Sequence, residues 1–308
     1  MTPDMTPEVT LELLSEHAVF GGVQRFYRHQ SVEIGLPMRF SIFLPEVALG
    51  RAPLSGEGTE VHQPAAVAAV PGLFYLAGLT CTEETFPTKA AAQQHAAAHG
   101  LALISPDTSP RGANVAGESD TWDFGVGAGF YLDATQAPWS THYRMYSYIV
   151  KELTALVCDT LPVDRTRLGI FGHSMGGHGA LVLGLREPEL FKSISAFAPI
   201  AAPRHCAWGQ KAFSGYLGAD RVAWSAYDAS ALMASRKAPL PHPILIDQGL
   251  GDKFLHDQQL QPEHFEAACA AVGQPLTMRK HARYDHGYYF IASFMADHIA
   301  HHAAILKG

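Results

Sequence analysis

A serine stands between two glycines in "GIFGHSMGGHGAL" (169–181), at G-x-S-x-G spacing. A buried strand is expected just before it and a helix from about 176 to 187, which is the setting of a nucleophilic serine. The turn between them is so tight that side chains in place of the glycines at 172, 176 and 177 would collide with their neighbours. Free N–H groups at the start of the helix favour negative charge. The pattern predicts Ser174 as a nucleophile; the alternative is a serine that only caps the helix.

A nucleophilic serine needs N–H donors for the oxyanion that forms when it attacks a carbonyl. The backbone N–H of Met175, the next residue, is one natural donor. The second is expected in the loop after the strand predicted at 72–78, where "AGLTCTEE" points to the N–H of Leu79. The alternative for Leu79 is a simple exit from the strand.

The serine also needs a base and an acid that orients it, and in this arrangement the order along the chain is Ser, Asp or Glu, His. Asp252 follows the strand expected at 242–249, in "LGDKFL". Asp247 lies inside or at the end of that strand, where a carboxylate more often serves as a structural hydrogen-bond partner. Asp257 lies farther along the loop. We therefore predict Asp252 as the acid.

The predicted base is His286, in "HARYDHGYYF", directly before the C-terminal helix. His281 ends the last strand itself and is less free to reach Ser174. A neutral imidazole accepts the serine proton, and the aspartate fixes its tautomer and stabilises the imidazolium. Ser174, Asp252 and His286 thus predict acyl transfer through an acyl-enzyme that water hydrolyses.

Other residues could carry different chemistry, and each has a simpler interpretation. Cys81 could be a nucleophile, but "LTCTEE" lacks the strand-to-helix turn, so a small packed residue is favoured. His95 and His99 are four residues apart on a helix, and "DHIAHH" (297–302) is similarly suggestive of a metal. Both sets are expected to be surface histidines. No phosphate-binding or dinucleotide-binding glycine motif is present.

The elements that must position these residues alternate between strand and helix from residue 72 onward. A mostly parallel sheet with helices on both faces follows, an α/β fold, in a single domain spanning 1–308 without repeat or linker. Strands are expected at 38–45, 72–78, 101–106, 167–172, 193–199, 242–249 and 276–281. Helices are expected at 87–100, 143–161, 176–187, 262–273 and 287–307. Long loops are expected at 46–70, 107–141 and 206–218, and the aromatic residues of 129–135 and 206–218 either fill the core or line an acyl pocket.

Composition excludes several classes of function. The chain has 308 residues, 47% of them hydrophobic and 17% charged, enough for a large core. A net charge of −7 without a basic stripe argues against nucleic acid and anionic membrane as partners. No apolar run is long enough for a membrane span, and the N-terminus does not resemble a signal peptide. The four cysteines are widely spaced, which fits reduced thiols and a cytoplasmic location.

Seven motifs together resemble the S-formylglutathione hydrolase (esterase D) family, and the likeness runs from about residue 20 to the C-terminus. They are "GLTCTEETF", "SPDTSPRG", "GAGFYLDAT", "GHSMGGHGAL", "WGQKAFSGYLG", "DQGLGDKFL" and "YDHGYYFIASF". The resemblance implies an α/β-hydrolase fold and a cytoplasmic thioesterase, often a homodimer. The implied substrate is the small-molecule thioester S-formylglutathione, cleaved to glutathione and formate in formaldehyde detoxification, with no metal or organic cofactor.

The family's functional residues fall on the positions already chosen. The resemblance implies Ser174, Asp252 and His286 as the triad, Leu79 and Met175 as oxyanion donors, and Cys81 as a reactive cysteine outside catalysis. The chain departs from the family in the stretch from about 46 to 70, which is longer and richer in Ala and Gly. Two alternatives stay open: a general carboxylesterase for short acyl esters, and a binding protein on an inactive hydrolase fold.

Overall fold

The computed structural model describes residues 11–50 and 67–308, so most of the predicted loop at 46–70 lies outside the described residues. Within these two ranges, one sheet joins nine strands in the order β1-β2-β3-β5-β4-β6-β7-β8-β9. Pairs from β5 to β9 are parallel, and those from β1 to β3, together with β3–β5, are antiparallel. The strands are β1 (Glu12–Val19), β2 (Gly22–Gln30), β3 (Pro37–Leu44), β4 (Val70–Leu76), β5 (Ala102–Pro106), β6 (Val163–His173), β7 (Phe191–Phe197), β8 (Ile244–Gly249) and β9 (Leu276–His281). The predicted mostly parallel sheet is confirmed.

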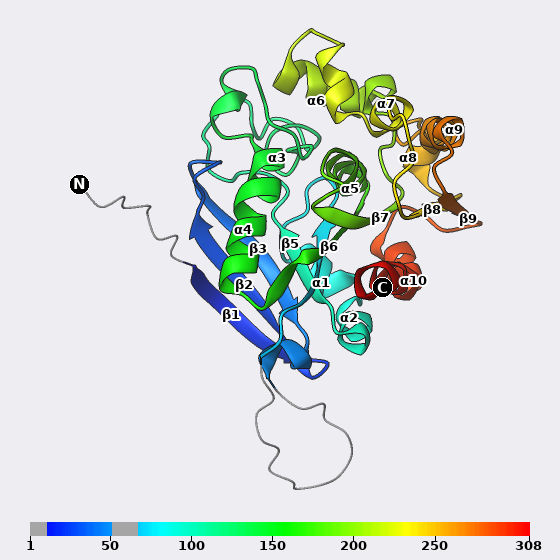
Figure 1. Ribbon diagram of the computed structural model, residues 1–308. Coiled ribbons are helices and arrows are strands. Elements are labelled where there is room, and N and C mark those ends of the chain that lie inside the picture. Colours follow the sequence, from blue (N-terminus) through cyan, green and yellow to red (C-terminus); the bar gives the residue numbers. More distant parts are fainter. Residues whose placement is uncertain (1–10, 51–66) are drawn as a thin grey trace, which may run out of the picture.

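Helices cover both faces of this sheet (Figure 1). The second and last helices, α2 and α10, pack together and cover one face, whereas α4 and α5 pack against the other. The α-helices are α1 (Thr85–Lys89), α2 (Gln93–His99), α3 (Met145–Ser147), α4 (Thr154–Thr160), α5 (Met175–Arg186), α6 (Ala207–Leu217), α7 (Ala229–Ala234), α8 (Lys253–His256), α9 (Pro262–Val272) and α10 (Tyr288–Lys307). A π-helical segment (Tyr148–Leu153) joins α3 to α4, and short 3₁₀ helices occupy Glu46–Leu49, Trp139–Thr141, Pro203–His205 and Ala223–Tyr227. No helix in these two described ranges combines the length and the apolar character that crossing a membrane requires.

Two predicted elements were wrong in outline. The single helix expected at 87–100 is two helices, because Ala91 between them has a positive φ of 53°. The loop expected at 206–218 is mostly the helix α6. Its glycines permit close packing instead of flexibility: a Cβ on Gly209 would lie 2.1 Å from the Pro203 carbonyl oxygen, and one on Gly215 would lie 2.4 Å from the Phe124 ring.

The histidines expected on the surface at 297–302 are also different in the structure. His298 and His302 are fully buried on the inner face of α10. His302 Nδ1 lies 2.6 Å from Ser193 Oγ and its Nε2 lies 2.8 Å from Ser195 Oγ. Ser195 Oγ is also 2.7 Å from His298 Nδ1, and His298 Nε2 is 3.3 Å from Asp247 Oδ2. The surface interpretation is therefore wrong for these two residues.

The direction of each hydrogen bond in this buried series can be derived by starting from the carboxylate of Asp247 at its end. A carboxylate only accepts, so His298 Nε2 donates to Asp247; because burial lowers the pKa of His298 and keeps the ring neutral, Nδ1 then accepts from the Ser195 hydroxyl. Ser195 Oγ then accepts from His302 Nε2–H, and His302 Nδ1 accepts from Ser193. Both histidines are neutral in this arrangement, in agreement with the lowering of both pKa values by burial.

We expect acid to destabilise the fold, because burial lowers the pKa of six histidines: His29, His173, His178, His298, His301 and His302. In the unfolded chain these groups bind protons as pH falls below about 6.5, whereas the folded chain excludes them. Stability is therefore full above pH 6.5 and is lost as pH falls. His178, whose pKa is about 4, alone accounts for on the order of 3 kcal/mol across this window. Thermal melts from pH 7.5 to 4.5 check this, and a constant Tm would contradict it.

Candidate active site

The serine of the G-x-S-x-G motif lies at the turn between β6 and α5. Ser174 has a strained backbone, with φ 58° and ψ −119°, and is 4% exposed. Its N–H donates to the Phe197 carbonyl at 3.0 Å, and its carbonyl accepts from the amides of His178 (2.9 Å) and Ile200 (3.2 Å). The neighbouring strand end and the helix thus hold the turn on both sides of the serine.

The predicted collisions at the motif's glycines are confirmed. A Cβ on Gly176 would lie 1.9 Å from the Leu76 carbonyl oxygen, and one on Gly172 would lie 2.2 Å from the carbonyl oxygen of Gly176. A Cβ on Gly177 would meet Pro199 at 2.9 Å. These contacts explain why the turn needs glycine on both sides of Ser174.

The loop after β4 approaches the serine closely. A Cβ on Gly78 would lie 3.2 Å from the Ser174 Cβ. The loop is held by hydrogen bonds from Thr80 N–H to the Gly127 carbonyl and from Cys81 N–H to the Gly78 carbonyl. Leu79, between them, lines the same cavity as Ser174. Met175 is the first residue of α5, where helix geometry leaves the N–H without an acceptor inside the helix.

The structure brings the predicted acid and base together. His286 Nδ1 lies 2.5 Å from Asp252 Oδ2, although 34 residues separate them in the sequence. Asp252 is fully buried; its Oδ2 also accepts from the Gln248 amide (3.2 Å) and its Oδ1 from the Phe254 N–H (2.8 Å). Burial opposes the charge on Asp252, but these bonds, first that from His286, keep the pKa of its carboxyl below the ordinary value.

The base lines the same cavity as the serine, and its other nitrogen has no hydrogen-bond partner among the described residues. His286 lines the cavity together with Ser174, and its Nε2 is buried and makes no hydrogen bond with the described residues, Ser174 included. Because Nδ1 faces a carboxylate, it carries the proton, and Nε2 is left as the acceptor. Looser geometry between base and nucleophile is common before substrate binds.

The rival aspartates and histidine have other partners. Asp247 is fully buried and accepts two 2.6 Å hydrogen bonds from Arg279, and its pKa is far below the ordinary value. His281 Nε2 lies 3.2 Å from Asp247 Oδ1, which places it in the same structural cluster. Asp257 is paired with Lys253 at the surface, at 2.6 Å. The interpretation of Asp247 as a structural hydrogen-bond partner is confirmed.

The cavity beside Ser174 has a volume of about 210 Å³ and largely aromatic walls. Trp122 and Trp208 rings meet edge to face at 5.4 Å, Trp208 and Phe254 lie 4.8 Å apart, and Phe254 meets His286 edge to face at 4.9 Å. From 206–218, Trp208 lines this cavity whereas Phe213 and Tyr216 fill the core, so both interpretations of these aromatics apply.

Some lining residues were not predicted from the sequence. Phe254 and Tyr288 stand only two residues after Asp252 and His286, so proximity to the predicted triad was the signal that could have found them. Trp122 lies in the long loop and gave no such signal. Gln248, which holds Asp252, is hidden at the end of a buried strand.

Cys81 also lines the cavity, and its environment does not activate it as a nucleophile. Burial raises the pKa of its thiol, although hydrogen bonds from Thr85 and Tyr288 and the charge of Lys89 oppose this shift. A thiol needs a lowered pKa to react as a thiolate near neutral pH. The four cysteines are all free thiols.

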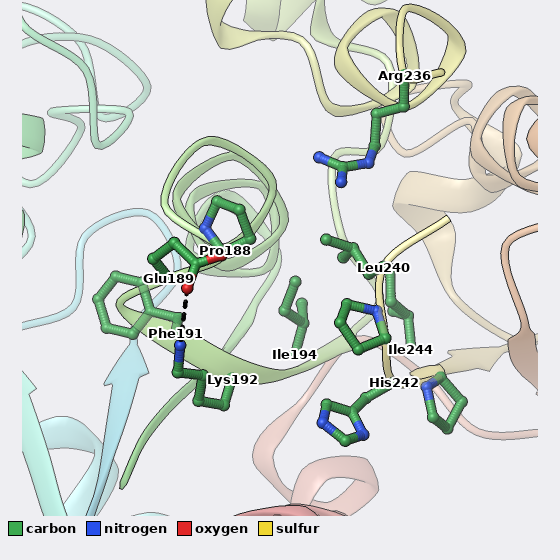
Figure 2. A pocket seen from close by; sticks show the side chains of 11 residues that line it. Pro188, Glu189, Phe191, Lys192, Ile194, Arg236, Leu240, His242 and Ile244 are labelled. Carbon is green, nitrogen blue, oxygen red and sulfur yellow. Dashed lines mark hydrogen bonds and ion pairs between the residues drawn. The ribbon is translucent and has the colours of Figure 1, made fainter. Parts of the chain in front are cut away.

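A second cavity, of about 190 Å³, lies at the amino ends of β7 and β8, on the opposite edge of the sheet from Ser174 (Figure 2). Figure 2 shows Glu189 and Lys192 joined on one side, 3.3 Å apart, and Arg236 on the other. It contains no member of the predicted triad. Across the ranges that the structure covers, no group of three or more His, Cys, Asp or Glu residues is arranged to hold a metal ion.

Comparison with known proteins places the chain in a family. Residues 57–301 match a family model described as "Putative esterase". The S-formylglutathione hydrolase of Bos taurus is 50% identical over 97% of this chain and 100% of its own length. That of Paracoccus denitrificans is 50% identical over 95% of this chain and 97% of its own. The solved S-formylglutathione hydrolase of Agrobacterium tumefaciens superposes with a TM-score of 0.87 at 45% identity, covering 96% of this chain and 99% of that one. The chain therefore belongs to the S-formylglutathione hydrolase family, with an α/β-hydrolase fold.

Proposed function

We propose that this protein hydrolyses S-formylglutathione to glutathione and formate through an acyl-enzyme on Ser174, with His286 as base and Asp252 as its orienting acid. The observation that carries the substrate is 50% identity, over nearly the whole chain, to S-formylglutathione hydrolases. The chemistry is supported by the hydrogen bond between the buried Asp252 and His286, beside a strained serine. A cavity of about 210 Å³ beside Ser174 has room for a short acyl group.

In acylation, the Ser174 hydroxyl attacks the formyl carbon while His286 Nε2 takes its proton. The negative charge that forms on the carbonyl oxygen is stabilised by the backbone N–H groups of Leu79 and Met175. Asp252 accepts from Nδ1–H and stabilises the imidazolium. The C–S bond then breaks, and the glutathione sulfur leaves with the proton from His286. Ser174 is left carrying a formyl ester.

In deacylation, water takes the place of the thiol. His286 removes one water proton as the oxygen attacks the formyl carbon, and the same two N–H groups hold the oxyanion. The bond from carbon to Ser174 Oγ breaks, the serine regains a proton from His286, and formate leaves. The cycle needs no metal or organic cofactor, since the base and the oxyanion donors supply proton transfer and charge stabilisation.

We expect kcat/KM for S-formylglutathione to exceed that for p-nitrophenyl acetate by at least about 100-fold, because a matched leaving group adds binding energy that a simple ester lacks. Both substrates are measured side by side on one preparation, and Ser174→Ala gives the background rate. Equal or faster cleavage of the ester would favour the alternative, a general carboxylesterase for short acyl esters.

We further propose that residues 1–308 form a single domain that works in the cytoplasm as a homodimer. The joining of all nine strands of the described ranges into one sheet supports the single domain. Widely spaced, free cysteines support a reducing compartment. A small-molecule thioester is the expected partner, without nucleic acid or membrane, in keeping with the net charge of −7.

A further inference from the structure

His173, the residue before the serine, has no part in the cycle above, yet its ring lies beside the base. It is 6% exposed and lines the cavity with Ser174 and His286. Neither of its ring nitrogens makes a hydrogen bond of normal geometry with the described residues, the nearby backbone carbonyl of His286 included, and His286 Nε2 makes none either. Buried polar atoms without partners are uncommon and need an explanation. Here three such atoms lie on two neighbouring rings.

The ring of His173 lies between the base and the oxyanion loop. Its centroid is 4.3 Å from that of His286, with the planes tilted by 48°, and 6.1 Å from that of Tyr288. On the loop side, a Cβ on Gly78 would approach His173 Nδ1 to 3.3 Å. The imidazole therefore lies between the loop that carries Leu79 and the ring of His286, and it occupies the space directly beside the base.

The charge state of this ring is set by its surroundings. Burial, and after it the neighbouring His286, hold the pKa of His173 well below the ordinary value; only the backbone carbonyl of His286 acts in the opposite direction. The other titratable side chains around the two rings are Asp252, bonded to His286, and the uncharged Cys81 and Tyr288 in the cavity wall. Of the two rings, only that of His286 contacts a carboxylate among the described residues.

We propose that His173 is a positioning residue for the base: a dry, uncharged wedge that fixes the His286 ring toward Ser174 and keeps water from solvating its far side. This inference rests on the proposed triad and deepens it. The required property is bulk without charge. The unpartnered nitrogens are not needed for the wedge, since an apolar group of the same shape would fill the space without leaving polar atoms unpaired.

His173→Ala and His173→Leu test the wedge. The alanine variant opens space that water fills, so kcat should fall about 10- to 100-fold with KM changed less than about threefold. The admitted water stabilises the protonated base, so the acidic limb of the kcat/KM profile should move to higher pH by about half a unit or more. The leucine variant refills the space without a charge and should recover kcat to within about fivefold, with the acidic limb in its original place.

His29 provides a control, because it is also buried, burial lowers its pKa, and its Nδ1 makes no hydrogen bond with the described residues, although Glu152 Oε1 lies 3.7 Å away. His29 lies on β2, away from His286, and its ring centroid is 5.7 Å from that of Tyr148, on which it stacks. His29→Ala should lower Tm but leave kcat and the acidic limb unchanged.

Two results would overturn the inference. One is wild-type kcat and an unmoved acidic limb in His173→Ala. The other is an equal loss in His173→Leu, which would mean that the nitrogens are required. The Ser174→Ala variant distinguishes a failure of this inference from a failure of the proposed function. If Ser174→Ala stays active, the triad itself is wrong. If Ser174→Ala is inactive and His173→Ala is fully active, the triad stands and only the role of His173 is wrong.

Discussion

Ser174→Ala is expected to lower kcat for S-formylglutathione by about 10⁴-fold or more, while the protein stays folded. The substitution removes the only atom of the site that bonds covalently to the formyl carbon. The fold should tolerate it, since the strain at φ 58° belongs to the backbone and the bonds that hold Ser174 are made by its own N–H and carbonyl. Steady-state turnover measures the loss of kcat, and a thermal melt checks that the protein stays folded. Labelling by a fluorophosphonate, which should be lost in Ser174→Ala, checks that Ser174 is the residue that forms the covalent bond.

Ser235→Ala is the control for this experiment, because Ser235 is exposed and, among the described residues, its hydroxyl bonds only to the Leu232 carbonyl. It should keep wild-type turnover and wild-type labelling. The contrary result would be a Ser174→Ala enzyme that still turns over, paired with an inactive Cys81→Ser. That pair would make Cys81 the nucleophile, against the raised pKa of its thiol.

The candidate site could be predicted from the sequence because its residues follow strands. Parallel strands end at the same edge of a sheet, so a serine after β6, an aspartate after β8 and a histidine after β9 can meet there if these strands lie close together. The observed order β6-β7-β8-β9 places β8 and β9 side by side, with only β7 between β6 and β8. Local patterns of apolar residues and glycine, which predict where the strands end, were therefore enough to predict that Asp252 and His286 lie close together.

The parts that were missed depend on contacts between distant segments. His298 and His302 read as surface residues because their partners, Ser195 and Ser193, are 103 to 109 residues away on β7. The glycines of α6 suggested a loop because the elements pressed against them, at Pro203 and Phe124, cannot be seen in a local window.

The first hairpin was missed for a different reason. The edge strand β1 is exposed or half-exposed along its whole length, so it shows no alternation of buried and exposed residues. Its partner β2 is held in place by pairing with β3 on the other side. Strands of this kind are defined by their neighbours more than by their own sequence.

Asp252→Asn is expected to lower kcat by about 10³- to 10⁴-fold for thioester and ester alike. Both oxygens of Asp252 accept hydrogen bonds, Oδ2 from His286 and Gln248 and Oδ1 from the Phe254 N–H. An asparagine has only one acceptor oxygen, so its NH₂ group must face one set of donors. Facing His286, it forces the imidazole to accept at Nδ1 and to carry its proton on Nε2, where it cannot take the proton of Ser174.

The comparison with the two rival aspartates makes this prediction specific to one residue. Asp257→Asn changes only a surface pair with Lys253 and should keep wild-type turnover and Tm. Asp247→Asn weakens the buried pairing with Arg279 and His298, so it should lower Tm, with kcat of the folded enzyme within about tenfold of wild type. A nearly active Asp252→Asn beside a folded but inactive Asp247→Asn would assign the orienting role to Asp247. The bond from His286 Nδ1 to Asp252 Oδ2, at 2.5 Å, favours an inactive Asp252→Asn beside a nearly active Asp247→Asn. The base can be oriented only by the carboxylate that it contacts.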